Sequence, residues 1–342
     1  MRQHARPAPR ILEDGWRRVA RAPAVWIGAW LLLVVVTLPA ALAVGHLIRV
    51  DLGHSLAGDA MLRAVDWAWW QEFLSRHPGM SSLFRPSIIG VAPVVRNASD
   101  FVEANPLSGW MALLGVVFGG LWIFLLGGIL DRYARQRRLG SYAFFGACGT
   151  YFWRFLRLAV IVGLLYGILY GLLHPWLFDT LYPWMTREVT VERTGFLLRL
   201  MLYLPFLGLV AATMLLVDIA KARAVVEDRR SMLGALVAAV RFVRRNPGSA
   251  AAVFGGNVLI FALVALCYAI LAPGASHGST LSIVYAAVIG ELYIAARIGV
   301  KLAFMASAVA LVQDRLAHAG FTAAPTPVWP DSPAAESIRN SA

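Results

Sequence analysis

Charged residues are scarce in this sequence. Asp, Glu, Lys and Arg make up 15% of the 342 residues, whereas soluble domains carry about 25%. Hydrophobic residues reach 59% and the mean hydropathy is +0.66. The apolar residues also lie in blocks of the length, about 18 residues or more, that crosses a bilayer. This composition excludes a soluble core of this length and predicts an integral membrane protein.

Cysteine and enzyme motifs are lacking too. Only Cys148 and Cys267 occur. We expect the first beside the cytoplasm and the second inside a span, which excludes a disulfide framework. The sequence has no Walker loop, no GxSxG turn, no dinucleotide fingerprint and no catalytic carboxylate pair in a hydrophilic domain. We therefore identify no catalytic and no cofactor-binding residue.

Histidine gathers on one predicted side of the membrane, and the imidazoles could form a metal or pH-sensing site with nearby carboxylates. No HxxxH, HExxH or CxxC spacing supports such a site, so we name no metal ligand. The residues concerned are His46, His54, His77, His174 and His277, with Asp51 and Asp59.

The apolar blocks predict an all-α, polytopic bundle of about six transmembrane helices. The first block is about 25 residues long, which exceeds the roughly 7–15 of a signal peptide core, so we expect it to be retained. A basic segment (1–23) would precede the membrane domain (24–315), and a Pro-rich tail (316–342) would be disordered. The predicted spans are 24–48, 108–130, 155–178, 195–217, 250–272 and 282–312, with a periplasmic interfacial segment at 49–107.

Basic residues are distributed unevenly between the connecting segments. Excluding the tail, 19 Lys and Arg lie on one predicted side and seven on the other. The positive-inside rule then places both termini in the cytoplasm. Because these residues flank apolar blocks, we expect anionic lipids of the cytoplasmic face as partners, and no nucleic acid. The membrane-surface residues are Arg137, Arg138, Arg229, Arg230, Arg244 and Arg245.

Two cytoplasmic connections share a layout. Ser141 and Ser231 each begin an amphipathic stretch, and an arginine follows each serine after 13 residues, at Arg154 and Arg244. Serine can cap the free N–H groups at a helix start. A looser copy precedes the first span. The pattern predicts interfacial amphipathic helices before spans 1, 3 and 5, in a three-fold hairpin repeat. The alternative is that basic, amphipathic loops are simply common in membrane proteins.

Several of these runs carry a resemblance. DIAKARAVVEDRR (218–230), followed by a Ser-started helix that ends RFVRRNPG (241–248), resembles the membrane domain attached to some glycerophosphoryl diester phosphodiesterases. DWAWWQEF (66–73) and FGACGTYFWRFLRL (145–158) are similar to uncharacterised six-helix bacterial membrane proteins. The resemblance covers about residues 10–315 and implies the six-helix fold and the inner membrane of a bacterial cell. It implies no activity, because the catalytic domain of the phosphodiesterases is absent.

Glycine recurs at intervals of four residues in two predicted spans. Gly115 and Gly119 share one helix face, and Gly163, Gly167 and Gly171 share another. Small residues at this spacing let helix backbones approach closely in a membrane. We therefore predict helix packing at these faces, with tolerated glycine as the alternative.

Four charged residues fall within predicted spans: Arg199, Glu291, Arg297 and Lys301. A charge near the bilayer centre costs at least about 2.5–3.5 kcal/mol. Arg199 lies near the end of its span and can reach outward. The last block, about 46 Å long at 1.5 Å per residue, exceeds the roughly 30 Å hydrocarbon core. Its true span is either 298–315, which puts Glu291 and Arg297 near the outer surface, or centred on Arg297, which buries all three charges.

Three functions stay open. The first is a scaffold or interaction protein of the cell envelope, which would bind a membrane protein or a second copy through a dry, glycine-packed centre. The second is a transporter or permeation protein for a small or lipid-like substrate, which would need a polar cavity among the helices. The third is a membrane enzyme acting on lipid, which would need clustered His and carboxylates at one interface.

Overall fold

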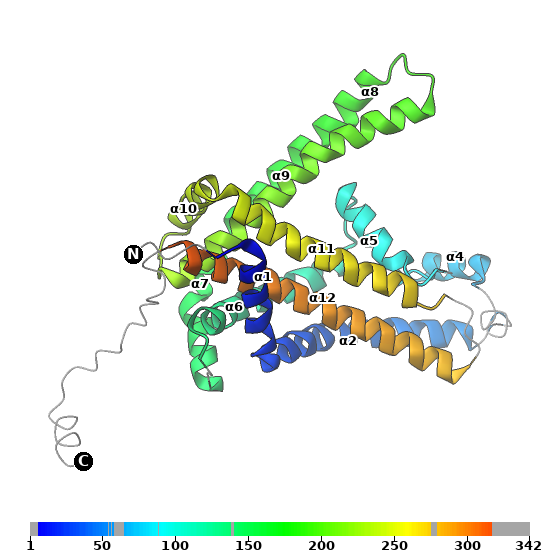
Figure 1. Ribbon diagram of the computed structural model, residues 1–342. Helices are drawn as coiled ribbons and strands as arrows, with labels where there is room; N and C mark the ends of the chain where they lie inside the picture. Colours follow the sequence, from blue (N-terminus) through cyan, green and yellow to red (C-terminus); the bar gives the residue numbers. More distant parts are fainter. Residues whose placement is uncertain are drawn as a thin grey trace, which may run out of the picture.

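The computed structural model describes residues 6–316 except 54, 56, 58–64, 88, 138–139 and 275–278. Every regular element in this part of the chain is a helix, which confirms the all-α prediction (Figure 1). Six helical stretches are long and apolar enough to cross a membrane. They are α2 (Pro23–Leu52), α6 (Gly109–Arg135), α7 (Ser141–Ile168) with its continuation to Met185, α9 (Glu192–Val226), α11 (Pro247–Leu271) and α12 (Thr280–Arg315).

Shorter helices complete the fold. They are α1 (Ala8–Ala20), α4 (Trp67–Arg76), the 3-10 turn η1 (Met80–Leu83), α5 (Ala92–Val102), the π-helical segments η2 (Leu169–Leu173) and η3 (Trp176–Leu181), α8 (Tyr182–Met185) and α10 (Met232–Arg245). The predicted tail falls outside the described residues, apart from Leu316.

Proline decides where two of the amphipathic stretches separate from the spans that follow them. The residue before a proline is disfavoured in helical conformation, so Pro23 and Pro247 end α1 and α10 and begin α2 and α11. No proline lies between Ser141 and Ile168, and α7 runs unbroken through that stretch. The predicted boundary at 155 is therefore wrong: the interfacial helix expected before the third span is the first part of one long helix.

The serine caps were predicted correctly at one of the two sites. The Ser231 hydroxyl accepts a hydrogen bond from the Gly234 N–H at 3.2 Å and so caps α10. Ser141 is instead the first residue of α7, and Gly140 occupies the capping position without a side-chain bond.

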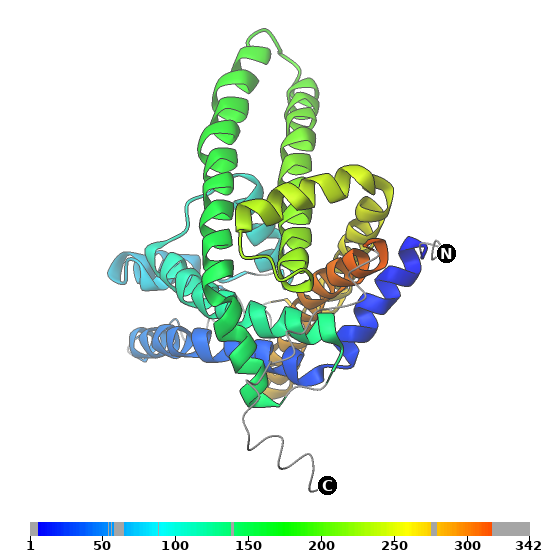
Figure 2. The same ribbon diagram turned by 90° about the vertical axis from the view of Figure 1, so that its left-hand side faces the viewer.

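One end of the molecule holds α1, α10 and the C-terminal parts of α6, α9 and α12; we call it the basic end (Figures 1 and 2). The largest cluster of buried side chains lies there, around the C-terminal half of α12, which is buried from Ile298 to Val312 apart from Lys301 and Phe304. α1 packs against this half of α12, and Arg6 pairs with Asp314 at 2.7 Å. Both ends of the described chain therefore lie at the basic end.

Large apolar side chains are exposed along the other part of the molecule, as expected for helices that face lipid. This apolar belt covers residues 27–50 of α2, 107–121 at α6, 160–176 of α7 and η2–η3, 191–214 at α9, 258–271 of α11 and 281–292 of α12. Its limit on the basic side is thus close to Trp122, Asp218 and Arg297, where burial within the protein begins. The belt supports the multi-pass membrane assignment.

The segment between α2 and α6 contributes two helices, α4 and α5. Asp66 caps α4 by accepting bonds from the N–H groups of Ala68 and Trp69. Trp69, Trp70 and Phe73 are buried against the end of α2, so this aromatic cluster packs on protein. Among the described residues of 84–104, the one regular element is the 11-residue helix α5, which is too short to span a bilayer.

The hairpin formed by α7, α8 and α9 diverges from α2, α11 and α12 (Figures 1 and 2). α5 contacts it: Arg199 of α9 pairs with Glu103 at 2.6 Å, and the His174 ring lies 3.1 Å from the Val102 carbonyl oxygen. A cavity opens where the hairpin leaves the other helices, and it is the candidate functional site.

Candidate binding cavity

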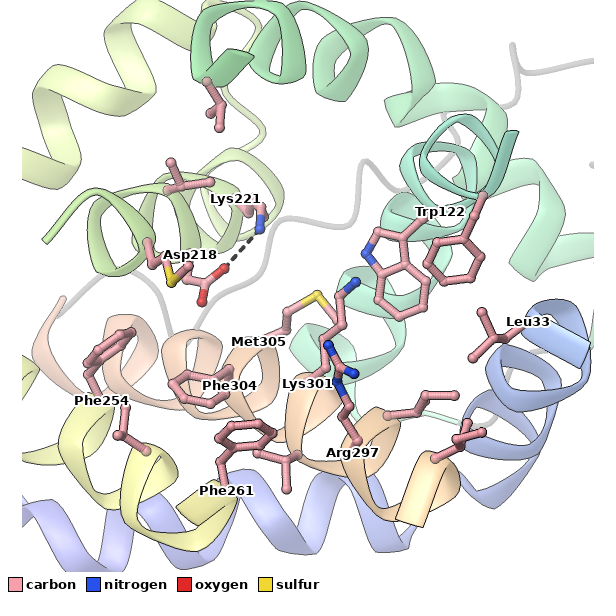
Figure 3. A pocket seen from close by; sticks show the side chains of 18 of the residues that line it. Leu33, Trp122, Asp218, Lys221, Phe254, Phe261, Arg297, Lys301, Phe304 and Met305 are labelled. Atoms are coloured by element: carbon pink, nitrogen blue, oxygen red, sulfur yellow. Dashed lines mark hydrogen bonds and ion pairs between the residues drawn. The ribbon is translucent and has the colours of Figure 1, made fainter. Parts of the chain in front are cut away.

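The cavity has a volume of about 700 Å³ and lies among α2, α6, α7, α9, α11 and α12. Ligand pockets in proteins have volumes of about 300–1,000 Å³. Most of its wall is apolar and aromatic, and four charged side chains complete it (Figure 3). The principal lining residues are Leu33, Phe118, Trp122, Val162, Tyr166, Met214, Asp218, Lys221, Phe254, Val258, Phe261, Ile294, Arg297, Lys301, Phe304 and Met305.

Two of the four charges neutralise each other. Lys221 donates to Asp218 at 2.8 Å, and both residues lie on one face of α9 because they are three positions apart. In the sequence, these residues appear only within the run 218–230 that carries the resemblance. Their place in the cavity follows from the continuation of α9 beyond the predicted end of its span.

Arg297 and Lys301 are the other two charges, and they lie one turn apart on α12. Both side chains point into the cavity, with Lys301 directed toward Trp122 (Figure 3). The Lys301 Nζ lies 4.0 Å from the centre of the Trp122 ring and 5.6 Å from that of Phe118. Among the described residues, no carboxylate lies within 4.0 Å of either cation. The cavity therefore carries an excess of positive charge.

Hydrogen bonds from two tryptophans of α2 show which part of α2 lies beside Arg297. The Trp26 indole donates to the Ala295 carbonyl oxygen at 2.7 Å, and the Trp30 indole donates to Glu291 at 2.9 Å. Trp26 is in the first turn of α2, so Arg297 lies level with the beginning of that helix. Both placements considered for the last span stay predictions: α12 carries exposed apolar side chains at 281–292 and buried ones at 298–312, and Arg297 and Lys301 lie where these two parts meet.

The four charges singled out in the sequence do not form one cluster. Glu291 contacts Trp30 and does not line the cavity. Arg199 lies in the outer part of the hairpin, where Glu103 and the rings of Tyr182 and Tyr203 hold it. Only Arg297 and Lys301 come together.

The predicted glycine faces do not pack within the chain. A methyl group added at Gly115, Gly119, Gly163, Gly167 or Gly171 would meet no other atom within 4 Å, so no neighbouring helix covers these positions. The spacing identified a shared face correctly, but that face points away from the chain's own helices.

Close backbone approaches occur at other glycines. A Cβ at Gly127 would lie 2.7 Å from the Ala147 carbonyl oxygen, and one at Gly299 would lie 2.6 Å from the Trp26 ring. Neither position belongs to the two predicted faces, and no other glycine lies four residues from either of them, so the four-residue spacing could not identify them.

The predicted surface arginines lie at the basic end. Arg137, Arg230, Arg244 and Arg245 are exposed there, and Arg138 falls outside the described residues. Arg229 differs, because it pairs with Glu227. These positions agree with a membrane-surface role for the group.

Sequence analysis missed a buried polar network at the same end. Arg18 is only 5% exposed, and it donates to the Tyr133 carbonyl oxygen at 3.0 Å and to Gln313 at 2.7 Å. It also pairs with Asp14 at 3.0 Å. Burial alone would raise the pKa of Asp14, but the hydrogen bonds and charges of Arg18 and Arg6 outweigh it and hold that pKa below its ordinary value. The network joins α1, α6 and α12.

The described residues contain no group of three or more His, Cys, Asp or Glu that could hold a metal. His54, His277 and Asp59 fall outside them, and Cys148 and Cys267 are free. Comparison of the chain with protein-family models, with curated proteins and with solved structures found no match. The resemblance to phosphodiesterase membrane domains therefore stays a prediction.

Proposed function

We propose that this integral membrane protein binds an anionic, lipid-like substrate in the cavity and transports it. The observation that carries the proposal is the pair of cations, Arg297 and Lys301. No carboxylate of the described residues lies within 4.0 Å of either, because Asp218 pairs with Lys221. An ionisable group at membrane depth is costly and marks a functional site by default. A bound anion would supply the missing negative charge.

The shape of the cavity favours an amphiphile over a small hydrophilic anion. The charged side chains lie at the basic-end limit of the apolar belt, which is where a lipid headgroup would lie. Phe254, Phe261 and Leu33 continue the wall with apolar surface suited to acyl chains. If the basic end faces the cytoplasm, the substrate comes from the inner leaflet, where anionic lipids and basic residues attract each other.

Lipid transport by the purified protein tests the proposal. We expect vesicles containing the protein to move fluorescent phosphatidylglycerol between leaflets faster than phosphatidylcholine. The double variant Arg297→Gln/Lys301→Gln should lose this preference, while the matched control Arg199→Gln, an arginine outside the cavity, should keep it. Equal movement of both lipids by the unaltered protein, or equal activity of all variants, would contradict the proposal.

A scaffold function is the second candidate, and one observation favours it. Gly163, Gly167 and Gly171 form a face that no helix of the described chain covers. In a bilayer, such a face suits a second copy or another membrane protein.

A further inference from the structure

A second cavity, of about 520 Å³, lies at the basic end between the C-terminal parts of α9 and α12 and helix α10. Five arginines line it: Arg223, Arg229, Arg241, Arg245 and Arg315. We call it the arginine pocket. It shares no lining residue with the cavity around Arg297 and Lys301.

Three of these arginines are fixed by the protein. Arg223 is 8% exposed; it donates to the Ala238 carbonyl oxygen at 2.6 Å and pairs with Glu227 at 2.6 Å. Arg229 pairs with the same carboxylate. Arg315 donates to the Arg6 carbonyl oxygen at 3.0 Å and to the Ser249 hydroxyl at 2.9 Å. One wall of the pocket is therefore built and rigid.

The other two arginines are available to a ligand. Arg241 and Arg245 are four residues apart on α10, so they share a face of that helix. Both side chains are exposed, and no carboxylate of the described residues lies within 4.0 Å of either. Their charge is not offset by the protein.

The charge balance of the pocket is positive. Among the described residues, two carboxylates pair with these arginines: Glu227, and Asp314, which also pairs with Arg6 at 2.7 Å. Burial alone would raise the pKa of Glu227, but hydrogen bonds from Arg223 and Arg229 outweigh it and hold the pKa below its ordinary value. Glu227 thus stays ionised at neutral pH and is already shared by two arginines. Among the described residues, positive charge is therefore in excess around the arginine pocket.

We propose that the arginine pocket is a binding site for a phosphate-bearing anion. A guanidinium group presents a planar fork of donors that matches two phosphate oxygens at once, and clustered arginines are the usual way to bind such groups. The phosphate could belong to a soluble molecule or to a lipid headgroup. The exposed apolar side chains of Leu233 and Val237, on the same helix, would allow contact with a membrane surface.

Binding to the purified full-length protein in an uncharged detergent tests the proposal. The soluble probe is inorganic pyrophosphate at constant ionic strength, and the measurement is titration calorimetry. We expect Arg241→Gln/Arg245→Gln to weaken binding about tenfold or more, because the charge-assisted hydrogen bonds from both guanidinium groups to the phosphate oxygens are lost. Arg244→Gln is the matched control, because Arg244 is an exposed neighbour on α10 that does not line the pocket. It should bind as the unaltered protein does.

The lipid probe is phosphatidylglycerol in discs of phosphatidylcholine. This measurement uses the Arg297→Gln/Lys301→Gln background, so that the cavity of the proposed function does not contribute to lipid binding. A negative result for the arginine pocket is then independent of the outcome for that cavity. If Arg241→Gln/Arg245→Gln loses pyrophosphate binding, the ligand of the pocket is a soluble phosphate compound. If it loses lipid binding alone, the ligand is a lipid headgroup. Two results would overturn the site: no loss with either probe, or an equal loss in Arg244→Gln, which would show unspecific attraction to a basic surface. The single variant Arg241→Gln repeats both arms if the double variant does not fold.

Discussion

Arg18 shows what a single residue contributes to the basic end. It extends from α1 into the space between α6 and α12 and donates to a backbone carbonyl, an amide oxygen and a carboxylate. A buried cation with all these partners holds three helices in one arrangement. Removing it would leave the Tyr133 carbonyl oxygen and Gln313 without this donor and Asp14 with Arg6 alone. The free-energy cost of such a loss is set by the groups that stay behind.

We therefore expect Arg18→Met to lower the free energy of unfolding by about 3–5 kcal/mol, as when one partner of a buried ion pair is removed. Thermal unfolding in detergent measures the change. Arg17→Met is the matched control, because the Arg17 side chain is 64% exposed and its pair with Glu13 lies on the surface. The control should change stability by about 0.5 kcal/mol or less. Similar losses in the two variants would show that the buried network has no special role.

At the scale of elements, α1 and α12 pack closely at the basic end. Gly15 of α1 faces Ser307 of α12, and a Cβ at Gly15 would lie 2.2 Å from the Ser307 Oγ and 2.8 Å from its Cα. The second atom belongs to the backbone and cannot turn away. The two helices can approach this closely only because position 15 has no side chain.

Gly15→Ala should destabilise the protein by about 1–3 kcal/mol, the usual cost of overpacking, despite the gain of about 1 kcal/mol in helix propensity. Gly167→Ala is the control: it adds the same methyl group to open space and should not destabilise the monomer. Unfolding temperature and molecular mass in detergent are the measurements. Unchanged stability of Gly15→Ala would contradict the packing. Dissociation of a dimer by Gly167→Ala would favour the scaffold function instead.

At the scale of the whole molecule, the two ends of the described chain lie at the same end of the bundle, as six crossings require. The structure contains no membrane, and the distribution of basic residues predicts that this end faces the cytoplasm.

Reporter fusions test this orientation. Cytoplasmic reporters after Arg245 and Leu316 should be active, and periplasmic reporters after Ser87 and Thr190 should be active, because the first two positions lie at the basic end and the others beyond the belt. Activity of a periplasmic reporter after Leu316 would reverse the assignment and place the cavity at the outer leaflet.

The spans were predictable because hydropathy is a local property. The predicted 250–272 corresponds to α11, which begins at Pro247 and ends at Leu271. The cavity was not predictable, because it depends on which helix faces meet. Arg297 and Lys301 could be singled out by their rarity in an apolar stretch, but that stretch is longer than a bilayer, so its sequence alone gave no depth. The glycine spacing likewise identified a face without showing what the face contacts.

The attachment of the first helix to the last has a consequence for biosynthesis. α1 leaves the ribosome first, yet Ile11 and Val19 are buried in a core that includes the C-terminal half of α12. Until residues near Asp314 are made, the side chain of Arg6 has no such partner and the apolar face of α1 is uncovered. Before α12 is made, the nascent protein therefore has five spans in the bilayer, and the apolar face of α1 is not covered by α12. The basic end is completed only once α12 has been made, and a chain that terminates before α12 would leave α1 open to chaperones or proteases.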